Sequence, residues 1–195
     1  MSDLTKIIAI GGSAGSVVVL FEFLRLIPAD FRPPILIVMH RLREKRSELC
    51  KLFQSQTKLT VIEPVNITPI KGGCIYLAPP GVHMIVENKH ELNIDNSPLV
   101  QFAKPSIDVL FSSAAEVFRK SLMGILITGT NRDGAMGMKA INENGGITVV
   151  QDPINARHSR MPQSAIDATK IDYILSKEKI FDLIINYKLT EKKKL

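Results

Sequence analysis

Three polar segments in this sequence follow apolar runs, and each of them carries a reactive side chain. The first is Ser13, within Gly11-Gly12-Ser13-Ala14-Gly15, which has the form G-x-S-x-G. Such a turn pushes a serine hydroxyl out of a sheet, and small neighbours prevent clashes. The helix start that follows offers free backbone N–H groups and a positive dipole end, and both suit an oxyanion. The segment is therefore a candidate site for nucleophilic attack by Ser13.

The same turn permits a second interpretation, a phosphate-binding loop, because glycine-rich strand–helix turns also cradle nucleotides. The dinucleotide fingerprint G-x-G-x-x-G would place glycine at Ser13, and the next strand would end in an acidic residue for the ribose. Here that strand ends in Met39-His40. A dinucleotide is therefore disfavoured, but the motif alone leaves a nucleophile and an anion site both open.

His40 and Asp133 complete a possible triad. His40 closes the apolar run 35–39, and a neutral imidazole there could take the serine proton. Asp133, in the polar segment 128–135, could be a helix N-cap or the carboxylate that orients His40. Since ligands bind beyond the carboxyl ends of parallel strands, we expect Ser13, His40 and Asp133 to converge there. Their chain order differs from that of α/β-hydrolases, which disfavours that superfamily.

The elements that must position these residues alternate between strands and helices. Buried strands are predicted at 7–10, 35–39, 60–62, 122–127 and 147–150, and helices at about 16–26, 44–54, 106–119 and from 135 to about 144. This alternation predicts a parallel sheet with right-handed crossovers. Three short runs, 75–78, 82–86 and 91–94, are separated by turn residues and predict antiparallel strands at one edge. The predicted fold is α/β: a doubly wound, mainly parallel sheet with an antiparallel edge hairpin.

Composition limits the classes of protein that remain. A chain of 195 residues with 45% hydrophobic and 23% charged residues fits one globular domain, which we expect over 1–188, with a basic tail over 189–195. Cys50 and Cys74 form neither a CxxC pair nor a disulfide framework, and neither a metal nor an organic cofactor is expected.

Charge and hydropathy narrow the expected surroundings. The sequence shows neither a secretory signal nor an apolar run of about 18 residues, so a cytoplasmic protein without membrane insertion is predicted. The net charge of +6 raises the question of nucleic acid. The basic residues are scattered and not interleaved with aromatic ones, so nucleic-acid binding is not expected. A mildly basic surface fits an acidic protein partner equally well.

Along nearly its whole length the sequence resembles the catalytic domain of chemotaxis protein-glutamate methylesterases of the CheB type. The resemblance is carried, in order, by Ile10-Gly11-Gly12-Ser13-Ala14-Gly15, Val38-Met39-His40, Tyr76-Leu77-Ala78-Pro79, Pro105-Ser106-Ile107-Asp108-Val109-Leu110-Phe111, Leu126-Ile127-Thr128-Gly129, Asp133-Gly134-Ala135, Gly145-Gly146 and Gln151-Asp152. It implies that Ser13 is the nucleophile, His40 the general base and acid, and Asp133 the orienting carboxylate. It also implies hydrolysis of glutamate methyl esters on the cytoplasmic helices of chemoreceptors, with release of methanol, and deamidation of certain receptor glutamines.

The sequence departs from that family at several places around the expected site. Ala14 and Ser16 replace a usual threonine and glycine, and Thr130 and Asn131 replace a common methionine and a frequent glycine. These departures affect the lining of the site and hence substrate preference and rate. They leave open a catalytically degenerate member that serves as a binding or regulatory module.

Two further expectations concern regulation and access. Regulated family members carry a receiver domain ahead of the esterase, whereas here the esterase strand begins by Lys6. No receiver is therefore expected, and a separate regulatory protein could take its place. The basic residues after His40, which are Arg41, Arg43, Lys45 and Arg46, form either a solvated loop or a rim that steers acidic receptor helices.

Overall fold

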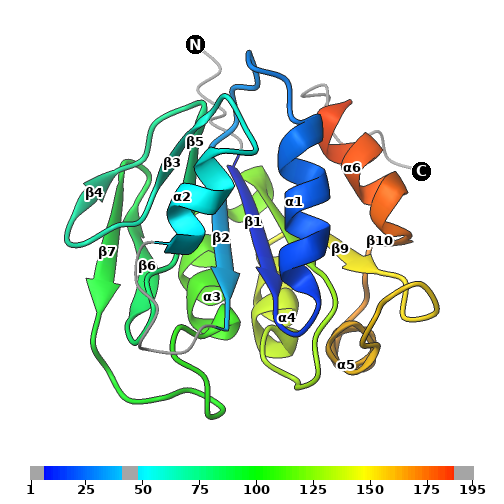
Figure 1. Cartoon of the computed structure of the whole chain (residues 1–195). Coiled ribbons are helices and arrows are strands. Elements are labelled where there is room, and N and C mark those ends of the chain that lie inside the picture. Colours follow the sequence, from blue (N-terminus) through cyan, green and yellow to red (C-terminus); the bar gives the residue numbers. More distant parts are fainter. Residues whose placement is uncertain (1–6, 41–47, 187–195) are drawn as a thin grey trace.

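Among residues 7–40 and 48–186, which the computed structural model describes, a seven-stranded parallel sheet forms the centre of the molecule (Figure 1). In spatial order its strands are β10 (Tyr173–Leu175), β9 (Ile147–Gln151), β8 (Leu122–Leu126), β1 (Ile7–Gly12), β2 (Ile35–Met39), β5 (Cys74–Leu77) and β3 (Thr60–Ile62). Every residue of β8, β1 and β2 is buried. This burial explains their continuous apolar sequences, since strands covered on both faces need no polar alternation.

Helices cover both faces of this sheet (Figure 1). One face carries α1 (Ser16–Leu26), α2 (Glu48–Gln54) and α6 (Lys177–Ile185), and the other carries α3 (Ile107–Phe118), α4 (Ala135–Glu143) and α5 (Arg160–Ala168). A short 3-10 helix, Arg119–Ser121, follows α3. Successive residues of β2 enter opposite cores: Leu36 and Val38 pack with Phe111, whereas Ile35 and Ile37 pack with Phe23. This alternation follows from the period of two residues in a strand. The predicted doubly wound α/β fold is confirmed.

The predicted edge hairpin is corrected in two respects. The segment 75–78 does not join an antiparallel sheet, because β5 pairs in parallel with β2 and β3 inside the main sheet. Its side chains Ile75, Tyr76 and Leu77 are all fully buried, which is typical of a strand covered on both faces. The other two runs do pair with each other, but in a separate antiparallel sheet with the order β4 (Thr68–Pro69), β7 (Glu91–Asp95) and β6 (His83–Asn88).

The order of the strands creates a switch point beside β1. From β1 the chain builds β2, β5 and β3 on one side, and later β8, β9 and β10 on the other. Adjacent crossovers therefore leave β1 and β8 in opposite directions, which opens a crevice at their carboxyl ends. Ser13 follows β1, and the segment 127–134 follows β8. The fold thus places two of the three predicted site segments at its natural ligand-binding position.

The region after β9, where the sequence pattern is weaker, holds α5, β10 and α6. The predicted start of a helix at 44, and the predicted basic tail from 189, lie outside the described residues. None of the helices in the described part of the chain is long and apolar enough to cross a bilayer.

Candidate active site

Ser13 lies in a tight turn between β1 and α1. Its backbone N–H donates to the carbonyl of Thr128 at 3.0 Å, and its own carbonyl accepts from the N–H of Ser16 at 3.0 Å. The hydroxyl of Ser16 also donates to this carbonyl, at 2.6 Å. Gly15 has φ 82° and ψ −9°, close to the third position of a type II turn, where a side chain would be strained. The turn is therefore fixed by backbone bonds that leave the Ser13 hydroxyl free to point outward.

The two glycines before Ser13 allow helices to approach the end of β1 closely. A Cβ atom on Gly11 would overlap the side chain of Ile107, the first residue of α3. A Cβ atom on Gly12 would lie 2.6 Å from Cβ of Ser16, the first residue of α1. Real Cβ atoms do not approach other atoms so closely. The glycines thus bring the beginnings of α1 and α3 to the serine turn.

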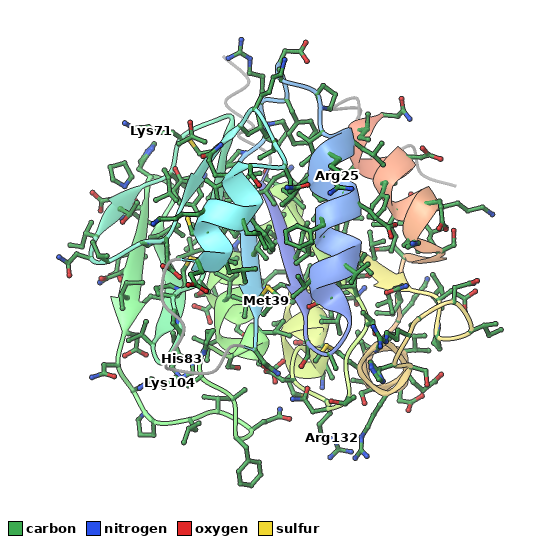
Figure 2. All side chains as sticks on the ribbon, viewed as in Figure 1. Arg25, Met39, Lys71, His83, Lys104 and Arg132 are labelled. Carbon is green, nitrogen blue, oxygen red and sulfur yellow. The ribbon has the colours of Figure 1, made fainter. Side chains whose placement is uncertain are left out.

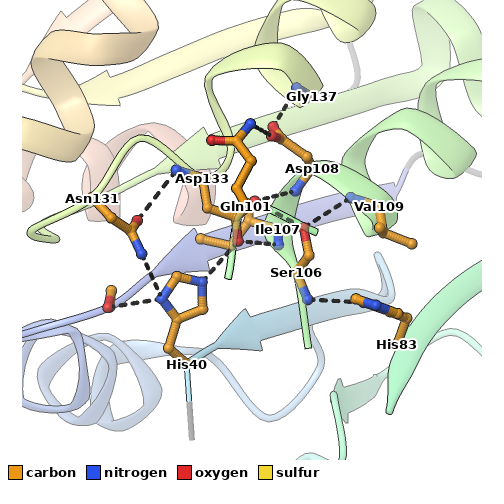
Figure 3. Close-up of polar contacts among 11 residues, drawn as sticks. His40, His83, Gln101, Ser106, Ile107, Asp108, Val109, Asn131, Asp133 and Gly137 are labelled. Carbon is orange, nitrogen blue, oxygen red and sulfur yellow. Dashed lines mark hydrogen bonds and ion pairs between the residues drawn. The ribbon is translucent and has the colours of Figure 1, made fainter. Parts of the chain in front are cut away.

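The structure brings Ser13, His40 and Asp133 into one line of hydrogen bonds, as the sequence predicts (Figure 3). Nδ1 of His40 lies 3.0 Å from Oγ of Ser13, and Nε2 lies 2.7 Å from Oδ2 of Asp133. The His40 side chain is 19% exposed, whereas Asp133 is fully buried. Because an ionised carboxylate only accepts, Nε2 carries the proton and Nδ1 holds the lone pair toward Ser13. This is the arrangement in which imidazole can take the serine proton.

The carboxylate of Asp133 lies against the beginning of α3. Oδ1 accepts from the hydroxyl of Ser106 at 2.8 Å and from the N–H of Asp108 at 3.0 Å, while Oδ2 accepts from the N–H of Ile107 at 2.7 Å. Burial by itself raises the pKa of Asp133, but the bonds from His40, Ile107, Asp108 and Ser106 outweigh it and hold this pKa below its ordinary value. Asp133 is therefore an anion that a helix N-terminus stabilises.

A second carboxyl group, Asp108, lies close behind the first. One of its oxygens accepts from the N–H of Gly137 at 2.7 Å, and the other accepts from the side-chain amide of Gln101 at 2.8 Å. Burial raises the pKa of Asp108 to about 6, and the neighbouring charge of Asp133 acts in the same direction. The sequence marks Asp108 only as an acidic residue in the first turn of a helix, so its burial is not visible there.

Ser106 connects the triad to a buried histidine. The backbone N–H of Ser106 donates to Nδ1 of His83 at 3.1 Å (Figure 3). Nε2 of His83 in turn donates to the carbonyl of Pro98 at 3.0 Å. Both Ser106 and His83 are fully buried. Ser106 is also the N-cap of α3. A serine before an apolar helical run could have been recognised as a cap, but its contact with Asp133 depends on the tertiary fold.

Thr128 fixes the segment between β8 and α4 to its neighbours. Its N–H donates to the side-chain amide oxygen of Gln151 at 3.0 Å, and its hydroxyl donates to the carbonyl of Ala14 at 3.1 Å. The N–H of His158 donates to the same hydroxyl at 2.9 Å. Further along the segment, the amide of Asn131 reaches His40, with Nδ2 lying 3.2 Å from Nδ1. The sequence marks Asn131 as a departure from the family pattern but does not predict this contact.

One exposed cation, Arg132, directly precedes Asp133 in the chain. Arg132 lines a cavity of about 370 Å³ together with Gln101, Met136 and Asp167. Figure 2 shows the Arg132 side chain extending from the edge to which the strands β1 and β2 point. The predicted basic rim of Arg41, Arg43, Lys45 and Arg46 lies outside the described residues. In the part of the chain that the structure describes, no group of three or more His, Cys, Asp and Glu side chains could hold a metal ion.

The chain is similar to known proteins both in sequence and in structure. The sequence model of the family described as CheB methylesterase matches residues 8–184. A relative from Leptospira interrogans, named putative protein-glutamate methylesterase/protein-glutamine glutaminase, is 42% identical over 178 residues, which are 91% of this chain and 92% of the relative. Protein-glutamate methylesterase FrzG of Myxococcus xanthus is 34% identical over 160 residues, which are 82% of this chain and 48% of FrzG. The crystal structure of the Thermotoga maritima CheB methylesterase catalytic domain superimposes with a TM-score of 0.88 at 27% identity, covering 94% of this chain and 98% of that one.

Proposed function

This chain belongs to the CheB methylesterase family, and from that premise we propose that it is a serine esterase acting on chemoreceptors. It hydrolyses glutamate methyl esters on their cytoplasmic helices to glutamate and methanol, and it acts in the cytoplasm. By the same chemistry it deamidates receptor glutamines. Ser13 is the nucleophile, His40 the general base and acid, and Asp133 the carboxylate that orients His40.

The observation that carries this proposal is the continuous line of contacts from hydroxyl to imidazole to carboxylate. The distances are 3.0 Å from Ser13 Oγ to His40 Nδ1 and 2.7 Å from His40 Nε2 to Asp133 Oδ2. Both lie within the range expected for a nucleophile, its base and an orienting group. A phosphate-binding turn would not need an imidazole on the serine or a buried carboxylate behind it.

The reaction proceeds in two stages. Ser13 Oγ attacks the ester carbonyl carbon while Nδ1 of His40 takes the hydroxyl proton, and the carbonyl oxygen becomes an oxyanion. The bond to the methoxy oxygen then breaks as His40 delivers its proton there, which releases methanol. A water molecule attacks the acyl-serine in the same way, its proton passing through His40 to Ser13 Oγ, and the glutamate side chain is released.

Backbone N–H groups in the serine turn are available for the oxyanion. Those of Ala14 and Gly15, directly after Ser13, donate to no acceptor among the described residues. Both stand at the N-terminal end of α1, whose dipole favours negative charge. One such preorganised donor contributes about 3–4 kcal/mol to acyl-transfer catalysis in a known serine protease.

The surroundings of the site support an acidic protein substrate. Arg132 directly precedes Asp133, and the side chain of Arg157 packs on Gly15, where an added Cβ would lie 3.1 Å from Cδ of Arg157. Neither guanidinium is paired with a carboxylate in the described part of the chain. Phe102 is 99% exposed and directly follows Gln101, which lines the cavity with Arg132. Exposed cations without carboxylate partners suit a negatively charged helix, and an exposed aromatic residue suits the apolar side chains of such a helix.

The decisive experiment measures methanol released from a methylated receptor fragment by the wild type and by Ser13→Ala and His40→Ala. We expect release by the wild type and loss of at least about 10³-fold in each variant, because removal of one triad member removes the activated nucleophile. Labelling of the wild type by a fluorophosphonate, absent in Ser13→Ala, would locate the nucleophile. Equal methanol release by all three proteins would overturn the proposal.

A further inference from the structure

The side chain of Asn131 shares a hydrogen-bond acceptor with the nucleophile (Figure 3). Its Nδ2 lies 3.2 Å from Nδ1 of His40, and Oγ of Ser13 lies 3.0 Å from the same nitrogen. The orientation of the amide is set by its other end, because Oδ1 accepts the backbone N–H of Asp133 at 3.2 Å. The NH₂ group of Asn131 must therefore point toward the imidazole.

The imidazole has one lone pair for these two donors. Nε2 donates to the carboxylate of Asp133, so Nδ1 is the only acceptor of the ring. An N–H of Asn131 that occupies this lone pair competes with the hydroxyl of Ser13 for it. In the resting enzyme the amide therefore stabilises the neutral imidazole and shares its lone pair with the hydroxyl of Ser13.

The chemical step removes this contact. When Nδ1 takes the proton of Ser13 it becomes a donor, and it then faces the NH₂ group of Asn131, which is also a donor. The amide cannot turn over to present Oδ1 without giving up the N–H of Asp133. An interaction present in the ground state and lost in the transition state raises the barrier.

We propose that Asn131 is a positioning residue that slows this triad by holding the lone pair of His40 in the resting state. The inference rests on the proposed esterase function and adds that Asn131 lowers the rate of proton transfer to His40 in the same site. It applies to acylation and to deacylation, since Nδ1 must accept a proton in both. Removing the amide should therefore accelerate both steps.

The first test is the rate at which a fluorophosphonate modifies Ser13, which needs the nucleophile and its base but no receptor. We expect Asn131→Ala and Asn131→Gly to react about three to ten times faster than the wild type, which corresponds to about 0.6–1.4 kcal/mol. Asn144→Ala is the matched control, because Asn144 also donates from its side chain, to the carbonyl of Ala140 at the end of α4, and lies outside the site. Its labelling rate should equal that of the wild type.

Two further readouts separate positioning from a structural role. In methanol release, Asn131→Ala should raise kcat with little change in KM, because the amide acts on proton transfer. In ¹⁵N NMR of the neutral ring, measured with Ser13→Ala so that no hydroxyl can replace the amide, Asn131→Ala should move the Nδ1 resonance of His40 toward the value of an unbonded nitrogen, while Asn144→Ala leaves it in place. A purely structural effect of Asn131 would lower kcat and leave this resonance without that directed shift.

The outcomes distinguish the two proposals. If the fluorophosphonate labels Ser13 in the wild type, and both Asn131 variants are labelled at the same rate or more slowly, the inference about Asn131 is overturned and the proposed esterase function stands. If Ser13 is labelled neither in the wild type nor in the two variants, both the proposed esterase function and the inferred role of Asn131 are overturned.

Discussion

The backbone N–H of Ile107 lies 2.7 Å from Oδ2 of Asp133, the same oxygen that accepts from His40. The first residue of α3 therefore holds the carboxylate of Asp133 in place, and this carboxylate in turn orients the imidazole of His40. With Ser106 and Asp108 bonded to the other oxygen, the beginning of one helix stabilises both the charge and the direction of Asp133. The position of α3 against β1 is thus part of the active-site geometry.

Asp133→Asn should lower kcat by about 10⁴-fold, the loss seen when the equivalent carboxylate of a serine protease becomes an amide. The NH₂ group of the new amide would meet a donor that the carboxylate oxygen had accepted from, such as the N–H of Ile107 or Asp108. We therefore also expect the free energy of unfolding at neutral pH to fall by about 1–3 kcal/mol. Since the folded pKa of Asp133 is lowered, its stabilising effect exists above the unfolded value of 3.8 and is lost as the pH falls through the folded pKa. Urea unfolding of both proteins from acid to neutral pH tests this. Asp182→Asn, on exposed α6 surface, is the control. A stability difference that grows toward acid pH would contradict the prediction.

Asp108→Asn should remove a pH dependence of stability that the wild type shows. The folded pKa of about 6 exceeds the unfolded value of 3.8, so the stability contributed by Asp108 is complete below the unfolded pKa and is lost as the pH rises through about 6. The difference amounts to about 3 kcal/mol, at 1.36 kcal/mol for each pKa unit. We therefore expect the free energy of unfolding of the variant, relative to that of the wild type, to increase from pH 4 to pH 7. Parallel pH profiles for the two proteins would refute this assignment.

Gly11→Ala should impair folding and catalysis together. The added Cβ overlaps Ile107, whose N–H holds Asp133, so α3 must move away from β1. Overpacking of this kind costs about 1–3 kcal/mol. Gly145→Ala is the matched control, because Gly145 has φ +74° but nothing within 4 Å of its added Cβ. It should cost about 1–2 kcal/mol through backbone strain alone and leave kcat unchanged. Thermal unfolding and methanol release measured on both variants decide the point, and normal kcat in a folded Gly11→Ala would argue against the coupling.

Reversal of charge at Arg132 and Arg157 should impair turnover of a receptor fragment but not of a small neutral ester. Steering by a charged rim changes association rates by tenfold or more at low ionic strength and is screened by salt. We expect Arg132→Glu combined with Arg157→Glu to lower kcat/KM for the fragment by about tenfold at low salt, with a smaller effect at high salt. Lys120→Glu serves as the control, because Lys120 precedes β8 at the opposite edge of the sheet. Equal losses for both substrates would mean that the arginines support the site itself.

Much of this protein is predictable from local sequence. Continuous apolar runs indicate strands buried on both faces, and glycine in a strand–helix turn indicates close packing and positive φ, so β1, α1 and β2 could be placed from their residues alone. The three reactive residues could be chosen because each follows such a strand. The predicted strands β1 and β2 and the helix α1 are confirmed, since they depend on contacts between residues near one another in the chain.

The tertiary structure decided what local patterns do not contain. The segment 75–78 has turn residues on both sides, yet β5 lies between β2 and β3, because the partner of a strand depends on which surfaces remain to be buried. The roles of Ser106 and Asp108 also depend on distant residues: each bonds to Asp133, at 27 and 25 positions along the chain. His40 and Asn131, 91 positions apart, meet only because β2 and β8 flank β1. Residue types and turns thus determined the possible chemistry, whereas the number and geometry of hydrogen bonds at each reactive atom were determined by long-range packing.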